Sequence, residues 1–185
     1  MSVEVVFETH SLSVDNERGV ATGWLSGSLS KSGQRLAKEL GERRRADEID
    51  VVFTSDLHRA VETAQIAFAG VGIPVYPDAR LRECNYGAMN GMPATRLEVE
   101  RPLRIDHPFP GGESWRQAVG RVGLFLEELA ETHDGQRVLT IGHVATRWAL
   151  DHFVNRTPLE ELVNAPFDWR EGWTYTLSAP VGATP

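Results

Sequence analysis

The feature that most constrains the fold of this chain is an alternation of short apolar runs with helical patterns. The apolar runs are too short for buried helices and predict strands; they cover residues 3–7, 49–53, 72–77 and 137–141. The helical patterns cover residues 31–45, 57–69, 114–131 and 144–154. This alternation predicts an α/β fold, a three-layer sandwich in which a mostly parallel sheet carries helices on both faces.

Two further segments complete the expected organisation. Residues 172–177 predict a last strand at an edge of the sheet, and Ser30 is placed to cap the helix that begins at Lys31. Residues 85–112 hold four prolines and predict a loop-rich excursion with a short helix near residues 94–101. A length of 185 residues fits a single domain, residues 1–185.

Charge and cysteine content exclude several classes of protein. A net charge of −7 argues against general binding to nucleic acid or to an anionic membrane. The first residues lack the basic flank of a signal peptide, and no stretch reaches the roughly 18 uncharged residues of a membrane span. Cys84 is the single cysteine, which excludes an internal disulfide framework and suits the cytoplasm.

Four chemically active residues follow four of the predicted strands. His10 and His143 come directly after the first and fourth strands, Arg59 lies in the first turn of the helix after the second, and Glu83 follows the third. Because the carboxyl ends of parallel strands meet at one edge of a sheet, where ligands bind, we expect these side chains to converge.

That combination suits phosphoryl transfer. An imidazole can attack phosphorus, a cation and a second imidazolium can neutralise the phosphoryl oxygens, and a carboxylic acid can protonate the leaving oxygen. Each residue taken alone also has a structural interpretation. Either histidine can cap a helix, Arg59 can pair with Asp56 or Glu62 on a solvated face, and Glu83 can be an ordinary loop carboxylate.

Competing chemistries lack their motifs. The chain has no P-loop, no G-x-S-x-G elbow and no H-E-x-x-H metal motif, so no metal and no cofactor are expected. The remaining histidines are predicted to be surface residues: His58, His107, His133 and His152.

Five motifs occur in a fixed order along nearly the whole chain. They are His10 with Asn16, then Gly23-Trp24 with Leu29-Ser30 and Gly33; Ser-x-Leu-x-Arg-Ala-x-x-Thr-Ala at residues 55–64; Leu-x-Glu-x-x-x-Gly at residues 81–87; Gly-Gly-Glu-Ser at residues 111–114; and His143 with Arg147. In this order they resemble the histidine phosphatase superfamily, the phosphoglycerate mutase-like fold.

The resemblance implies a role for each of these residues. His10 would be the phosphorylated nucleophile and Glu83 the general acid and base, while Arg59 and His143 would clamp the phosphoryl group and Asn16 would line its pocket. Residues 85–112 would form a short lid over a small phosphorylated metabolite. The resemblance implies a phosphomonoester hydrolase without a metal, and it is compatible with a homodimer.

Two positions depart from the family pattern. Thr9 stands where the family has arginine, and Ser11 where it has glycine; both flank His10 and would also contact the phosphate. Thr9 carries no charge, and the loss of one such donor typically costs about 10² to 10³ in rate. Another arginine can replace the missing cation, the candidates being Arg18, Arg82 and Arg147. Otherwise the activity is weak, or the chain is a non-catalytic protein that binds a phosphorylated ligand; a mutase is the further alternative.

Overall fold

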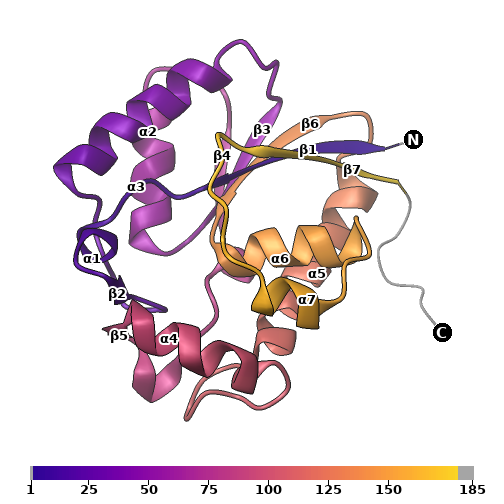
Figure 1. Cartoon of the computed structure of the whole chain (residues 1–185). Coiled ribbons are helices and arrows are strands. Elements are labelled where there is room, and N and C mark those ends of the chain that lie inside the picture. Colours follow the sequence, from indigo (N-terminus) through magenta and orange to yellow (C-terminus); the bar gives the residue numbers. More distant parts are fainter. Residues whose placement is uncertain (1, 179–185) are drawn as a thin grey trace.

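A five-stranded sheet forms the centre of the computed structural model, which describes residues 2–178 (Figure 1). Its strand order is β4-β3-β6-β1-β7. The strands are β1 (Val3–Thr9), β3 (Val51–Ser55), β4 (Val75–Asp78), β6 (Arg137–Gly142) and β7 (Trp173–Leu177). Four of them pair in parallel, and β7 runs antiparallel along β1 at the edge. The predicted fold class and the edge position of the last strand are confirmed.

Helices cover both faces of this sheet, as the alternation predicted. The helices that pack on it are α2 (Lys31–Arg44), α3 (His58–Ala67), α5 (Trp115–Thr132) and α6 (Val144–Phe153), with α7 (Leu159–Asn164) beside α6. Figure 1 shows α2 and α3 on one side of the strands and α5, α6 and α7 on the other. No helix within residues 2–178 is both long and apolar enough to cross a membrane.

The three central strands, β1, β3 and β6, are buried on both faces because each face has its own helical layer. Along β1, Val5 and Phe7 belong to the hydrophobic cluster that contains α5 and α6, whereas Val6 belongs to the cluster with α2 and α3. Successive side chains of a strand point to opposite faces, so an uninterrupted apolar run is what a doubly covered parallel strand requires.

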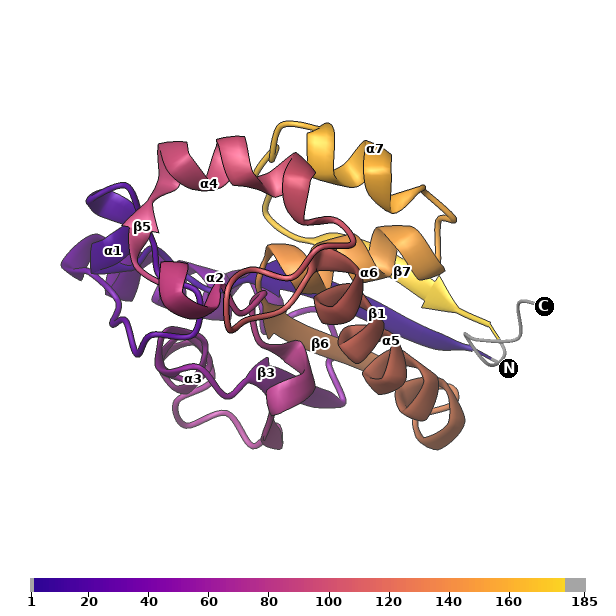
Figure 2. The same ribbon diagram turned by 90° about the horizontal axis from the view of Figure 1, so that it is seen from below.

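The remaining elements are the helix α1 (Val14–Glu17), the two-stranded ribbon of β2 (Val20–Ala21) and β5 (Met92–Pro93), the helix α4 (Ala94–Glu100), and three 3₁₀ helices, η1 (Ala79–Leu81), η2 (Gly87–Met89) and η3 (Arg101–Arg104). Of these, α1, β5 and α4 lie at the end of the molecule opposite the chain termini (Figure 2). The short helix expected near residues 94–101 is therefore present. The sequence did not predict α1, α7 or the ribbon, since elements this short carry too little periodicity to be recognised.

Helix α2 begins where the sequence predicted, and its first turn is pressed against the loop that follows β1. The Ser30 side chain accepts a hydrogen bond from Gly33 N at 3.0 Å. The Ser11 hydroxyl donates to the Gly33 carbonyl at 2.6 Å. A Cβ at Gly33 would overlap the carbonyl oxygen of Leu12, so this position requires glycine.

This close approach generates a matched pair of substitutions. We expect Gly33→Ala to lower the free energy of unfolding by about 1–3 kcal/mol, because the new methyl overpacks a backbone contact. Gly120 of α5 has nothing within 4 Å of its would-be Cβ, so Gly120→Ala should leave stability unchanged or raise it by up to about 1 kcal/mol. Urea unfolding of both variants measures the difference, and equal effects would contradict this account.

Candidate active site

Two histidines lie side by side at the carboxyl ends of neighbouring parallel strands. His10 follows β1 and His143 follows β6, and their ring centroids are 4.9 Å apart. The His10 backbone N–H donates to the Gly142 carbonyl at 2.9 Å, so the strand pairing itself sets the distance between the rings. Gly142 is required here because a Cβ would overlap the Thr146 side chain.

Arg59 joins the two imidazoles from the first turn of α3. Its side chain is almost fully buried, with Nε 3.3 Å from His10 Nε2 and Nη2 3.4 Å from His143 Nδ1. The carbonyls of Gly23 and Leu25 hold the same guanidinium at 2.9 and 3.2 Å. The structure therefore brings these three predicted site residues together.

The alternative in which Arg59 makes a surface ion pair is wrong. Asp56 is bound by Arg82, with both oxygens at 2.6 Å. Glu62 accepts from Leu29 N at 2.8 Å instead. Arg59 is left as a buried cation whose partners are two imidazole nitrogens and two carbonyl oxygens.

The donors of Arg59 decide the tautomer of each histidine. A guanidinium has no acceptor, so His10 Nε2 and His143 Nδ1 must both present a lone pair to it. In His10 the proton then sits on Nδ1, which donates to the Ser11 carbonyl at 2.7 Å. In His143 the proton sits on Nε2, which is buried and has no hydrogen-bond partner among the described residues. The pair thus offers an unprotonated His10 Nε2, which accepts from Arg59, and an unused N–H donor on His143.

Burial keeps both rings neutral. Desolvation, followed by the nearby charge of Arg59, lowers the pKa of His10 to about 3. The same two causes, in the same order, lower the pKa of His143 well below its usual value. The second imidazolium expected from the sequence is therefore a neutral N–H donor in the free protein, because a charged ring here would be both desolvated and repelled by Arg59.

Glu83 lies at the N-terminus of α6, next to the histidine pair. Its carboxylate accepts backbone N–H bonds from Cys84 at 2.8 Å, from Ala145 at 3.2 Å and from Val144 at 3.3 Å. Burial raises the pKa of Glu83, although these N–H groups and Arg59 oppose the shift. A carboxyl whose pKa is raised above its usual value suits the exchange of a proton with a leaving group.

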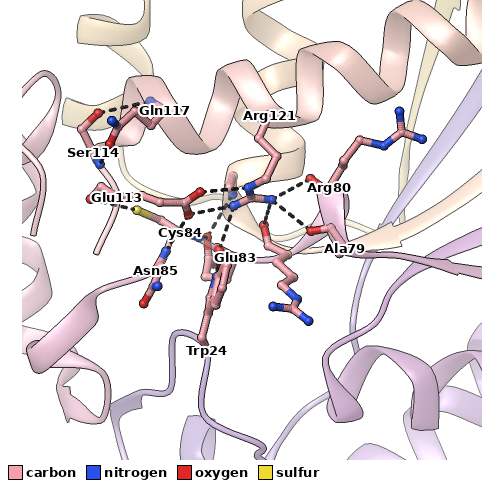
Figure 3. A network of polar contacts seen from close by, with 12 residues as sticks. Trp24, Ala79, Arg80, Glu83, Cys84, Asn85, Glu113, Ser114, Gln117 and Arg121 are labelled. Carbon is pink, nitrogen blue, oxygen red and sulfur yellow. Dashed lines mark hydrogen bonds and ion pairs between the residues drawn. The ribbon is translucent and has the colours of Figure 1, made fainter. Parts of the chain in front are cut away.

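Arg121 of α5 fixes the segment that carries Glu83, as Figure 3 shows. Its guanidinium donates to the carbonyls of Arg80 at 2.7 Å, Arg82 at 3.1 Å and Glu83 at 3.2 Å. It also pairs with Glu113 at 2.8 Å. The sequence analysis missed Arg121, since a helical arginine with no motif around it gives no signal.

The motif residues next to this segment also act as supports. The Trp24 indole donates to the Glu83 carbonyl at 2.7 Å, and the Arg82 guanidinium lies 4.5 Å from the centre of its ring. Ser114 caps α5 by accepting from Gln117 N. The Gly23-Trp24 and Gly-Gly-Glu-Ser motifs thus position the carboxylate.

Three other predicted site residues are engaged by the protein itself. Asn16 Oδ1 accepts from the backbone N–H and the hydroxyl of Ser13 at 3.1 and 2.8 Å. The Ser11 hydroxyl is bound to Gly33, and its backbone N–H donates to Thr63 at 2.9 Å. Thr9 Oγ1 accepts from the indole N–H of Trp169 at 3.3 Å. All three predicted residues, Thr9, Ser11 and Asn16, line the cavity described next.

A cavity of about 560 Å³ opens beside the histidine pair. Its walls are the end of β1 with residues 9–12, one side of α2, the pair His143 and Val144, and three residues of the segment between α7 and β7, together with Asn16 and Glu83. Residues 85–112, the predicted lid, contribute none of the lining side chains, and neither do the four histidines assigned to the surface. Within the described residues, no three or more His, Cys, Asp or Glu side chains gather so as to hold a metal ion.

None of the three arginines proposed to replace the family's missing cation lines this cavity. Arg82 is held by Asp56, and Arg147 pairs with Asp151 at 2.8 Å. Arg18 is exposed after α1. Arg43 of α2, which the sequence analysis did not single out, lines the cavity instead.

The neutral histidines make stability depend on pH. The unfolded chain binds a proton at His143 below a pKa of about 6.5, while the folded ring does not, so stability falls as the pH drops below that value. Between pH 7 and pH 5 this single ring should cost up to about 2 kcal/mol. In urea unfolding, His143→Gln should lose correspondingly less free energy of unfolding than the wild type between pH 7 and pH 5. His58→Gln, at a half-exposed site, should lose as much as the wild type. Identical slopes for all three proteins would contradict the neutral buried ring.

The chain was compared with known families and proteins. Residues 7–169 match the model of the histidine phosphatase superfamily (branch 1). A 2,3-bisphosphoglycerate-dependent phosphoglycerate mutase of Bifidobacterium longum is 37% identical over 205 residues, covering 90% of this chain and 83% of the relative. Phosphoserine phosphatase 1 of Hydrogenobacter thermophilus is 29% identical over 158 residues, covering 80% and 74%. The solved structure of Bacillus stearothermophilus YhfR matches with a TM-score of 0.82 at 25% identity, covering 98% of each chain.

Proposed function

The chain belongs to the histidine phosphatase superfamily (branch 1), and on that basis we propose that it hydrolyses a phosphomonoester through a phosphohistidine on His10. One observation carries the proposal: the unprotonated Nε2 of a neutral His10 lies beside the Arg59 guanidinium. The unprotonated nitrogen of a neutral imidazole is a nucleophile once Arg59 shifts its hydrogen bond from Nε2 to the phosphate, and the adjacent cation is placed where charge develops on the phosphoryl oxygens.

In the first step, Nε2 of His10 attacks phosphorus and the bond to the ester oxygen breaks. Arg59 Nε, which now points at Nε2, transfers its hydrogen bond to a phosphoryl oxygen. His143 Nε2–H supplies a second donor, which has no partner among the described residues. The phosphorylated ring becomes cationic, and the Ser11 carbonyl stabilises it through Nδ1–H.

Glu83 completes both steps. Its carboxyl gives a proton to the departing ester oxygen, so the leaving group departs as an alcohol. The resulting carboxylate then takes a proton from water as that water attacks the phosphohistidine. Nε2 is released with its lone pair, inorganic phosphate leaves, and Glu83 is again protonated. The raised pKa of Glu83 supports this double role.

Two observations keep other functions in view. The 37% identity to a phosphoglycerate mutase favours a phosphoryl transfer in which a second substrate hydroxyl, rather than water, accepts the group. Thr9 in place of the family's arginine favours a protein that binds a phosphorylated ligand without turnover. The three functions differ in what happens to His10. In a hydrolase it is phosphorylated and water then removes the phosphoryl group; in a mutase the phosphoryl group passes to a substrate hydroxyl. In a binding protein His10 is never phosphorylated.

Trapping the intermediate separates these functions. Incubation with a phosphomonoester that is turned over, followed by an alkaline quench, should leave acid-labile phosphate on His10, because the nitrogen–phosphorus bond survives base and not acid. Mass spectrometry of the digested protein locates the label, and His10→Ala should show neither label nor turnover. Steady turnover with phosphate on serine, or on no residue, rules out the mechanism. Label that transfers to 3-phosphoglycerate in preference to water identifies a mutase.

Glu83 has a separate kinetic signature. Glu83→Gln should slow the hydrolysis of an alkyl phosphate by about 10² to 10⁴, because its poor leaving group needs a proton. Hydrolysis of 4-nitrophenyl phosphate should fall far less, since that leaving group departs as a stable anion. Steady-state kinetics with both esters measure the ratio. Equal losses of rate with the two esters would show that Glu83 has a structural role at the N-terminus of α6 and does not donate the proton.

A further inference from the structure

The cavity extends beyond His10 to a surface rich in apolar side chains. Leu36 and Leu40 of α2 form one wall, and Phe167 and Trp169 of the segment before β7 form another. Three of these large side chains are well exposed, with Leu36 at 36%, Phe167 at 38% and Trp169 at 57% of their full area. Exposed aromatic and aliphatic side chains gathered along a cavity are typical of a ligand-binding wall.

Thr9 connects this apolar wall with the reactive nitrogen. It precedes His10 directly, and its hydroxyl accepts the indole N–H of Trp169. That bond satisfies the one polar atom of the indole and fixes the ring at its edge, which leaves the ring's apolar surface for a ligand.

The charges around the same cavity disfavour a second anionic group on the substrate. Four carboxylates line it, and Arg43 is the one arginine or lysine among its described lining residues. Arg43 is already held by the buried Glu8 at 3.1 Å and lies 4.0 Å from Glu171. Among the described lining residues, no cation is therefore free to pair with a carboxylate or a second phosphate on the ligand, and burying such a group without a partner is costly.

We propose that the leaving group of the substrate is an uncharged flat ring, aromatic or heteroaromatic, that binds between the leucines of α2 and Trp169. This proposal rests on the proposed function, since it concerns the other half of the same phosphomonoester. It separates this chain from relatives whose names specify phosphoserine or phosphoglycerate, because both of those ligands carry a carboxylate. The continuity of the apolar wall with His10 favours a substrate over a second copy of the chain as its occupant.

The experiment compares two esters with leaving groups of nearly equal acidity, phenyl phosphate and 2-naphthyl phosphate. The additional ring should raise kcat/KM about tenfold, which corresponds to the roughly 1.4 kcal/mol of one good aromatic contact. Both aryl esters should be preferred to phosphoserine and 3-phosphoglycerate. Trp169→Ala should remove the naphthyl preference by raising KM about tenfold while kcat stays close to that of the wild type.

Two further variants control for structural effects. Trp169→Phe keeps a ring and should retain most of the naphthyl preference. Tyr76→Ala removes a comparably exposed aromatic side chain from β4, away from the cavity, and should change neither ester. Circular dichroism and urea unfolding of each variant confirm that the fold is intact. A change in oligomeric state on Trp169→Ala, with an unchanged KM, would show that the wall binds a second copy and would overturn the proposal.

The outcomes distinguish this proposal from the proposed function. Phosphohistidine on His10 with no naphthyl preference, or with a preference that Trp169→Ala leaves intact, overturns the ring subsite alone. Absence of label and of turnover with every ester overturns the proposed function instead. Calorimetry with 2-naphthyl phosphate then still tests the subsite: binding about tenfold weaker in Trp169→Ala than in the wild type supports it, and equal affinity overturns it.

Discussion

The geometry of the site depends on one buried cation. Arg59 is 2% exposed, and its hydrogen-bond partners within residues 2–178 include no carboxylate, so its position is set by the carbonyls of residues 23 and 25 and by the two imidazoles. A buried charge is costly unless its donors are satisfied, and here hydrogen bonds satisfy them. The loop before α2 must therefore close over α3, and the ends of β1 and β6 must hold both rings against the guanidinium.

The same cation organises the proton chemistry. Because a guanidinium only donates, it selects one tautomer for each histidine, and its charge adds to desolvation in keeping both rings neutral. Glu83, 8% exposed, is pushed in the protonated direction by burial. Desolvation is the largest cause of all three shifts: it lowers the pKa values of the two histidines and raises that of Glu83. A phosphoryl dianion entering the site would supply the charge that the buried arginine lacks.

A second set of residues holds the segment that carries Glu83 in place. The segment that carries Glu83 has irregular backbone, and Arg121 and Trp24 take up its carbonyls. Cations also flank the Trp24 ring, with Arg82 at 4.5 Å and Arg121 at 5.9 Å from its centre. The motifs that identify the family thus contain residues that face the reacting group and residues that hold those site residues in place. The loop between α7 and β7 adds the apolar wall of the cavity beyond His10.

The sequence by itself determined the strands, the main helices and the convergence of His10, Arg59, Glu83 and His143, because apolar periodicity and parallel pairing are local rules that place strand ends at one edge. Only the tertiary structure decided the rest. Whether Arg59 lies on a solvated face or between two rings, which nitrogen carries each proton, and whether His143 is charged all depend on burial and on partners distant in the chain. Arg43 and Trp169 reach the cavity through packing that no motif encodes. Pairing and desolvation are properties of the folded environment, so a linear pattern can supply the chemical groups but not their protonation states or the shape of the space they enclose.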